Sequence, residues 1–461
     1  MSRAGRAVLA ALLLALALVA PASAASPTFE RPTATATFGE EIVFSQAFGS
    51  PFDLARVEIL LDYPNSLGAY VAQVAGATAA GSHALVHRHL LADDGHVVPN
   101  TPITARWRLV PADRTLKPVV GPPVTVTYAD TRFAWRTLEG DLVRLHWYEG
   151  SDSFGRRALE IGEKAVREAG SFLGVTESEP IDFFVYGAQD AFYDALGPGT
   201  RENVGGQAHS DIRTMFALIG PGDVGDSWVG VVIPHELTHL VFDSAVRNPY
   251  HFPPRWLNEG VAVYLSEGFT ASDRASVEAA ASGGRLMPLR ALGGEFPTTA
   301  ERFYLAYAES VSAVAFLVRE QGTPALVKLI RSYADGVTDD EAFSAAVGTD
   351  LAGFENAWLA DLGADPPTRH GPQPAPAGPL PPGWDSSASP AAADGSPPPG
   401  GSPEPGPGDP TGDEGSPLGE GWVLLVAALA GLLVGGSLAY VRRRRARNGA
   451  RGADETDGRA P

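Results

Sequence analysis

The chain of 461 residues contains no cysteine. It can therefore form no disulfide bond, offer no thiolate ligand to a metal ion and use no cysteine nucleophile. An exported protein without disulfides depends on its hydrophobic core for stability, and a chain of this length can bury a core of sufficient size.

An excess of positive charge is also absent. The chain has 35 lysine and arginine residues against 54 aspartate and glutamate residues, which gives a formal net charge of −19 at pH 7. Because such a chain repels the phosphate backbone of DNA and RNA, no nucleic-acid partner is expected.

The two longest apolar runs stand near the ends of the chain. Residues 1–25 combine early arginines, an apolar run and an Ala-Ser-Ala sequence, a pattern typical of a cleaved signal peptide; an uncleaved anchor is the alternative. Residues 421–441 are apolar and long enough, as a helix, to cross a bilayer. A cluster of arginines opens residues 442–461, so the positive-inside rule predicts a cytoplasmic tail there.

Between the ends, composition and periodicity divide the chain into three parts. Residues 26–130 contain short alternating runs separated by turns, which predict a β-sandwich-like domain. Residues 131–364 predict a small α/β lobe followed by a helical lobe, so the expected fold class is α+β. Residues 365–420 are dense in Pro, Gly and Ser, which predicts a disordered stalk. Expected strands lie at about 33–38, 56–61, 83–89, 103–109, 124–128, 142–147, 181–186 and 214–219, and expected helices at about 155–174, 272–281, 300–321, 323–334, 339–347 and 351–362.

The motif HELTH places His235 and His239 four residues apart. On a helix both imidazoles then point to one side and can bind the same metal ion. Glu236 lies about 100° further around the helix, where it can reach a water on that metal without being a ligand. A catalytic zinc ion usually takes three protein ligands, and Glu259 in the segment 256–260 (WLNEG) is the natural third.

Alternatives to this interpretation exist at two levels. Glu267 and Asp243 lie on the same two segments and compete with Glu259 for the third position. The motif could also be a polar patch on a solvated helix. Apolar residues at 231–233 and 240–242 argue against such a patch, because buried histidine and glutamate side chains need partners that a metal ion would supply.

The local context of the motif predicts where its helix begins. Asp226 and Ser227 are good N-cap residues, and Pro234 predicts either a kink or a helix that starts at the proline itself. Before this helix, the segment 205–207 (GGQ) is expected either at a sheet edge, where an extended peptide could add as a strand, or in an ordinary turn.

Other zinc-peptidase patterns are missing. A metzincin would carry Gly at position 242 and His at position 245, where this chain has Phe242 and Ala245. The inverted motif HxxEH is absent as well. The site is therefore expected to follow the arrangement of two histidines and a distant glutamate.

HELTH followed by WLNEG resembles the gluzincins, the peptidase clan whose third zinc ligand is a glutamate on the next helix. The segment 255–267 is similar to the second metal helix of aminopeptidases in that clan, although their GxMEN-type segment is absent here. The closer resemblance, over about 142–363, is to the bacterial peptidase MA-like group. Beyond the zinc motifs it rests on looser matches at Gly205, Gly206, the segment 307–310 (YAES), Gly348, Leu351, Phe354 and Trp358.

The resemblance implies one zinc ion bound by His235, His239 and Glu259, with Glu236 as the general base. It also implies a donor that shares the oxyanion with the metal. Tyr307 matches the family's tyrosine before the Glu-Ser pair, with Tyr304 and His209 as alternatives, and a purely structural core role is also open for Tyr307. Thermolysin-type gluzincins carry an aspartate four residues after the ligand glutamate, where this chain has Val263, so the residue that orients His235 is unassigned.

These observations predict a zinc metallopeptidase of the cell membrane, with a single C-terminal transmembrane helix, extracellular N-terminal domains and a short cytoplasmic tail. Its partners would be a peptide or protein substrate and the membrane, and its oligomeric state is not indicated. Two alternatives stay open, namely a zinc hydrolase of non-peptide substrates and a catalytically inert adhesion or scaffold protein with a peptidase-like domain.

Overall fold

The computed structural model describes residues 26–64, 66–197, 205–248 and 251–366. The expected signal peptide (1–25), transmembrane helix (421–441) and cytoplasmic tail (442–461) lie outside the described residues, as does the stalk from residue 367 onward. Within the described ranges, no helix combines the length and the apolar character needed to cross a membrane.

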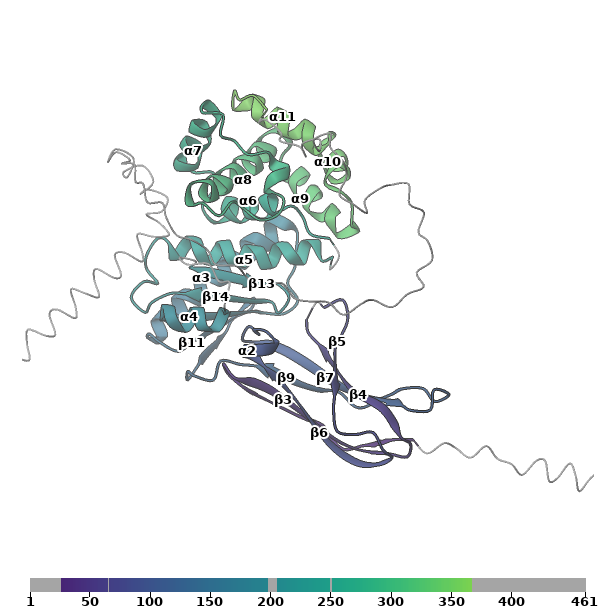
Figure 1. The fold of residues 1–461 in the computed structure, drawn as a ribbon. Coiled ribbons are helices and arrows are strands. Elements are labelled where there is room, and N and C mark those ends of the chain that lie inside the picture. Colours follow the sequence, from purple (N-terminus) through teal and green to yellow (C-terminus); the bar gives the residue numbers. More distant parts are fainter. Residues whose placement is uncertain (1–25, 65, 198–204, 249–250, 367–461) are drawn as a thin grey trace, which may run out of the picture.

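The first part of the chain folds into two antiparallel sheets that share one core (Figure 1). In one sheet β3 is central and pairs with β1, β2 and β6, and in the other β7 pairs with β4, β8 and β9 while β5 extends the edge beyond β4. In β7, which covers the strand expected at about 103–109, buried residues alternate with more exposed ones as the sequence predicted. The elements are β1 (Thr28–Phe29), β2 (Thr33–Thr37), β3 (Glu41–Ser50), β4 (Leu54–Asp62), β5 (Tyr70–Val74), β6 (Gly81–Leu90), α2 (Leu91–Asp94), β7 (Thr101–Pro111), β8 (Val119–Val120) and β9 (Val124–Tyr128).

The central strand β3 was not among the expected strands. Its inward positions are Ile42, Phe44, Gln46 and Phe48, so a polar residue interrupts the apolar series. Gln46 is nonetheless 1% exposed, because its side-chain amide donates to the carbonyl oxygens of Glu30 and Ala47, both at 2.7 Å. Both donors of this buried amide are satisfied, whereas its oxygen has no hydrogen-bond partner among the described residues. No local sequence pattern reveals that the partners of the donors will be there.

The second part is a five-stranded sheet with the strand order β10-β11-β12-β14-β13. The three inner strands are parallel, and the edge strands β10 and β13 run antiparallel to their neighbours. Ser151 caps the long helix α3, and Gly174 ends it in the left-handed conformation, as expected for a glycine after a helix. The elements are β10 (Arg136–Glu139), β11 (Val143–Trp147), α3 (Asp152–Leu173), β12 (Ile181–Tyr186), α4 (Gln189–Leu196), β13 (Gly206–His209) and β14 (Thr214–Leu218).

The rest of the described chain is helical, and Figure 1 shows α5 lying between the sheet and the later helices. The five helices expected after residue 267 are all present, with bounds within a few residues of the prediction. Capping boxes at Thr270 and Thr338 fix the starts of two of them. The elements are α5 (Val229–Val246), α6 (Arg255–Ser266), α7 (Ala271–Ser282), η1 (Leu289–Leu292), α8 (Ala300–Gln321), α9 (Thr323–Ser332), η2 (Tyr333–Asp335), α10 (Asp339–Val347) and α11 (Leu351–Asp361).

Helix α5 begins later than the sequence suggested. Its first residue is Val229, and neither Asp226 nor Ser227 caps it. The helix also continues through Pro234, so the expected start at the proline is wrong. The proline removes the N–H that would have bonded the carbonyl of Gly230, and Gly230 is exposed, where water can replace that donor.

The β domain and the second sheet contact each other through buried polar groups. The Tyr186 hydroxyl donates to Asp130 at 3.0 Å, and the Asn100 side-chain amide donates to Asp182 at 3.1 Å and to the Thr214 hydroxyl at 2.9 Å. Each of these bonds joins residues more than 50 positions apart in the sequence. Together they hold the β domain against the second sheet, on the side of that sheet that carries α4.

Helices α6 and α8 pack closely at Gly260. A Cβ built on this glycine would lie 2.5 Å from the carbonyl oxygen of Ser310 and 2.8 Å from a methyl group of Val314. A backbone oxygen cannot move aside as a flexible side chain can, so only glycine permits this spacing. The glycine that follows Glu259 therefore determines how near α8, which carries Tyr307, lies to α6.

We expect Gly260→Ala to lower the free energy of unfolding by about 1–3 kcal/mol, because the added methyl group overpacks the α6–α8 contact. Gly230→Ala is the matched control, since Gly230 is also helical but has open space around it. Urea unfolding of both variants measures the difference. Equal stabilities would show that the close contact has no energetic weight.

Candidate metal centre

The three expected ligand residues converge at one point. The Nε2 atoms of His235 and His239 lie 3.2 Å apart, and each lies 3.4 Å from Oε2 of Glu259. Helix α5 supplies the two imidazoles from one face, and α6 supplies the carboxylate. Among the described residues this is the one group of three or more His, Asp or Glu side chains close enough to hold a metal ion.

These spacings fit a bound zinc ion. Ligand atoms about 2.0–2.1 Å from a tetrahedral zinc ion lie about 3.3 Å from one another, which agrees with the three observed separations. Oε2 of Glu259 is buried and accepts no hydrogen bond from the described residues. A buried carboxylate oxygen without a donor is costly, so a cation is the missing partner that this donor set calls for.

The electrostatics of the cluster favour a positive charge. Burial alone would lower the pKa of His239, but the Glu259 carboxylate outweighs it and raises that pKa to about 9. Burial would likewise raise the pKa of Glu259, but the two imidazoles hold it well below its usual range. The carboxylate therefore stays ionised and stabilises a cation between the three ligand atoms.

Asn258 orients one of the two imidazoles. Nδ1 of His239 lies 2.8 Å from the Asn258 side-chain oxygen, which can only accept, so Nδ1 carries the proton and Nε2 presents its lone pair to the cluster. Sequence analysis used Asn258 only as context for Glu259 and did not assign it this role. For His235, the described residues show no equivalent partner at Nδ1, and Val263 is apolar and 6% exposed.

Glu236 lies next to the cluster beneath the edge strand β13. Burial raises the pKa of its carboxyl group, although the two imidazoles and the nearby backbone N–H of Ala208 act in the opposite direction. A Cβ built on Gly206 would lie 2.7 Å from Cγ of Glu236, so β13 can pack against this side chain only because position 206 is glycine. The segment 205–207 is thus part of a sheet edge rather than an ordinary turn.

Tyr307 also faces the site. Its ring centroid lies 6.3 Å from that of His235, and the Arg255 guanidinium acts electrostatically on its hydroxyl group. His209 packs edge-on against Phe216 at 5.5 Å, on the opposite face of the sheet from Glu236. Tyr304 packs against Phe303 at 5.8 Å. Of the three candidate donors, the structure therefore brings Tyr307 alone to the histidine pair.

The two other acidic candidates for the third position do not join the cluster. Glu267 ends α6, two turns beyond Glu259, and Asp243 lies one turn beyond His239 on α5. Burial raises the pKa of both carboxyl groups. Neither belongs to the group of converging ligand atoms.

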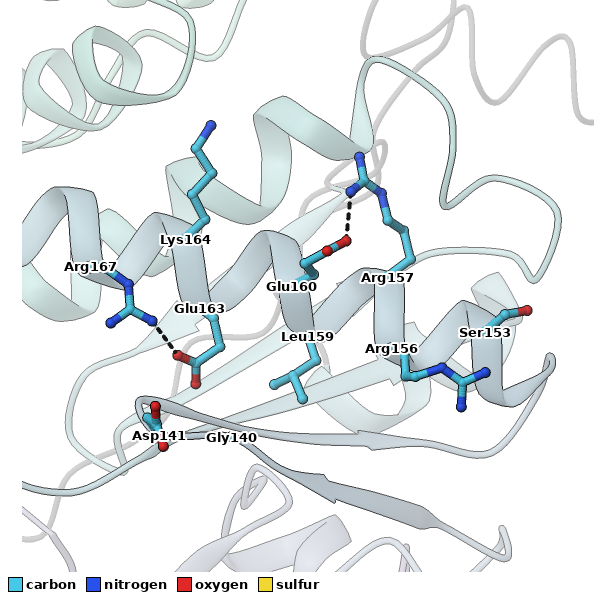
Figure 2. A pocket seen from close by; sticks show the side chains of 10 residues that line it. All are labelled: Gly140, Asp141, Ser153, Arg156, Arg157, Leu159, Glu160, Glu163, Lys164 and Arg167. Carbon is cyan, nitrogen blue, oxygen red and sulfur yellow. Dashed lines mark hydrogen bonds and ion pairs between the residues drawn. The ribbon is translucent and has the colours of Figure 1, made fainter.

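A groove along the outer face of α3 is a separate feature (Figure 2). Its charged side chains pair with one another, as in the bonds from Arg157 to Glu160 at 2.8 Å and from Arg167 to Glu163 at 3.1 Å. It shares no residue with the cluster of His235, His239 and Glu259. The groove is a solvated surface of paired charges, which gives no reason to place the chemistry there.

Comparison with known proteins agrees with this geometry. Residues 163–364, which include α5, α6 and α8, match the model of the Peptidase MA superfamily. The resemblance to the peptidase MA-like gluzincins is confirmed. None of the curated proteins compared matches the chain.

Solved structures that are similar to this chain include M1 zinc metallopeptidases and an aminopeptidase N family protein. An M1 zinc metallopeptidase from Deinococcus radiodurans is 15% identical, with a TM-score of 0.35 over 77% of this chain and 97% of that one. An aminopeptidase N family protein from Idiomarina loihiensis is 10% identical, with a TM-score of 0.38 over 70% of this chain and 74% of that one.

We expect Asn258→Ala to weaken zinc binding by about 10–100-fold, because His239 loses the acceptor that fixes its tautomer. Asn258→Asp keeps an acceptor oxygen in the same place and should bind zinc about as tightly as the wild type. Competition with a chelator of known affinity measures both dissociation constants. An alanine variant with wild-type affinity would contradict the orienting role of Asn258.

Proposed function

We propose that the protein is a zinc-dependent peptidase that hydrolyses peptide bonds outside the cytoplasmic membrane. The observation that carries this proposal is the convergence of His235, His239 and Glu259 at the spacings of a zinc ion, with Glu236 adjacent. The match of residues 163–364 to the Peptidase MA superfamily supports it. The location rests on the sequence alone, through the signal peptide and the C-terminal transmembrane helix expected there.

The residues of the site divide the chemistry among them. When bound by the three ligands, zinc supplies Lewis-acid activation of a water molecule and of the scissile carbonyl group. Glu236 accepts the proton of the attacking water and passes it to the leaving amine, a role that suits a carboxyl group whose pKa is raised by burial. Tyr307 donates a hydrogen bond from its hydroxyl group to the carbonyl oxygen as negative charge develops there.

The edge strand β13 is the proposed binding site for the substrate backbone. It pairs with β14 on one side, and no described strand pairs with its other side. An extended peptide that adds there as a further strand would pass directly over Glu236, because Gly206 and Ala208 contact that side chain.

The decisive assay compares hydrolysis of a peptide library with and without a zinc chelator. Chelator-sensitive cleavage of peptides supports the proposal. Zinc binding without cleavage of any peptide would favour the inert scaffold or a hydrolase of non-peptide substrates, and a panel of ester and amide substrates would then separate these two.

We expect Glu236→Gln to lose roughly 10²–10⁴-fold in kcat while it keeps one zinc ion per chain, because Glu236 moves a proton but is not a ligand. Glu168→Gln on the exposed face of α3 is the control and should retain full activity. Zinc content by elemental mass spectrometry and steady-state kinetics test both statements. Loss of zinc from the Glu236 variant would make Glu236 a ligand and overturn this assignment.

We expect Tyr307→Phe to lower kcat by roughly 10–10³-fold with little change in zinc content or stability, since it removes a donor used mainly in the transition state. Tyr304→Phe on the same helix is the comparison and should keep wild-type activity. Kinetics at saturating zinc measure the difference. A fully active Tyr307→Phe variant would return Tyr307 to a purely structural role.

A further inference from the structure

Arg255, the first residue of α6, bridges two groups of the proposed site. It stands one helical turn before Glu259, and its Nε donates to Oε1 of that carboxylate at 3.2 Å. The same guanidinium interacts electrostatically with the hydroxyl group of Tyr307, and the Phe296 ring contacts both side chains. Glu259 comes from α6 and Tyr307 from α8, so one side chain connects the third ligand to the proposed oxyanion donor.

The contact with Glu259 leaves one particular oxygen available. Arg255 occupies Oε1, whereas Oε2 accepts no hydrogen bond from the described residues and lies 3.4 Å from both imidazole nitrogens. A carboxylate held at one oxygen by a guanidinium cannot rotate freely about its terminal bond. Arg255 therefore directs Oε2, and not Oε1, toward the histidines.

The contact with Tyr307 leaves the hydroxyl proton of that residue free. Arginine has donors but no acceptor, so toward this guanidinium the phenolic oxygen of Tyr307 can act only as an acceptor. The hydroxyl proton then remains free to be donated elsewhere. A planar guanidinium can serve both partners at once, which a single ammonium group at the end of a lysine side chain does less well.

Arg255 is itself held in place on its other side. Its Nη1 donates to Glu295 at 2.9 Å, and its guanidinium lies over the ring of Phe296 at 4.8 Å from the centroid. The Phe296 ring packs edge-on against Tyr307 at 5.2 Å. The backbone N–H of Arg255 bonds the carbonyl of Gly293 at 2.9 Å. The segment 293–296 thus fixes the guanidinium from outside the two helices.

We propose that Arg255 is a positioning residue that presents Oε2 of Glu259 to the metal ion and the hydroxyl proton of Tyr307 to the substrate. The inference rests on the proposed function for its second half. The first half concerns only how the chain binds zinc.

The test measures zinc affinity and catalysis separately in Arg255→Met. We expect the zinc dissociation constant to rise about 10–100-fold, because Glu259 loses the bond that orients it. At saturating zinc, kcat should fall about 10-fold or more while KM changes little, because the proton donor is no longer directed. Arg285→Met is the matched control, since Arg285 forms a surface ion pair with Glu301 and should leave both quantities unchanged.

Two further variants make the test sharper. In a double variant with Tyr307→Phe, the loss of kcat should be smaller than the product of the two single losses, because both changes remove the same donation. Arg255→Lys keeps the positive charge and tests the positioning role of Arg255 if the methionine variant fails to fold. Its zinc affinity should lie within a few-fold of the wild type, whereas its kcat should stay lower.

Each half of the proposal can fail on its own measurement. Wild-type zinc affinity in Arg255→Met would overturn the first half. Wild-type kcat at saturating zinc in Arg255→Met, or in Arg255→Lys if only that variant folds, would overturn the second half, as would losses of kcat that simply multiply in the double variant. A wild-type chain that binds zinc but cleaves no peptide would overturn the proposed function instead. In that case the zinc affinities still decide whether Arg255 orients Glu259.

Discussion

Three lone pairs that face one another inside the protein are the constraint around which this site is arranged. His235, His239 and Glu259 point acceptor atoms at a common centre, each within 3.4 Å of the others. Without a cation this arrangement is unfavourable, since no donor from the described residues relieves Oε2 of Glu259. The raised pKa of His239 means that a proton supplies part of this positive charge when no metal ion is bound. The surrounding structure holds the three groups close together at the spacing that a metal ion needs.

Close helix packing provides that support. Glycine at position 260 brings α8 against the backbone of α6, and glycine at position 206 brings β13 against Glu236. At Gly260 a methyl group would collide with the backbone oxygen of Ser310, and at Gly206 it would collide with the side chain of Glu236 itself. The site is thus enclosed between an edge strand and two helices, and small residues set the distances at which Glu236 and Tyr307 stand from the metal ligands.

The metal ligands could be predicted from sequence because their geometry is local. Two histidines four residues apart on a helix share a face whatever the rest of the fold, and WLNEG marks the partner helix. Asn258 lies in that same segment and Arg255 directly precedes it, yet neither was assigned a role. Asn258 orients His239 on α5, and the group on the far side of Arg255 is Tyr307 on α8, so both roles depend on tertiary packing.

The fold shows the same division between local and long-range information. The helices after residue 267 were placed within a few residues, because capping residues and apolar periodicity are local. Strand β3 was missed, because the burial of Gln46 depends on Glu30, a residue from another part of the β domain. The start of α5 was misplaced for a related reason. Trp228 precedes the helix and makes no capping hydrogen bond with its side chain. The helix begins instead at Val229, which is fully buried by tertiary packing.

Neighbouring side chains in the described part of the chain orient two of the three metal ligands but not the third. His239 has Asn258, and Glu259 has Arg255, both from the start of α6. His235 has no such partner among the described residues, and the position where thermolysin-type enzymes place an orienting aspartate holds buried Val263. Two of the three ligands are thus oriented by neighbours of Glu259 within one helical turn. A displacement of that turn would disturb His239 on α5 and Glu259 on α6 at the same time. The N-terminal turn of α6 therefore determines the geometry of the site more than α5 does.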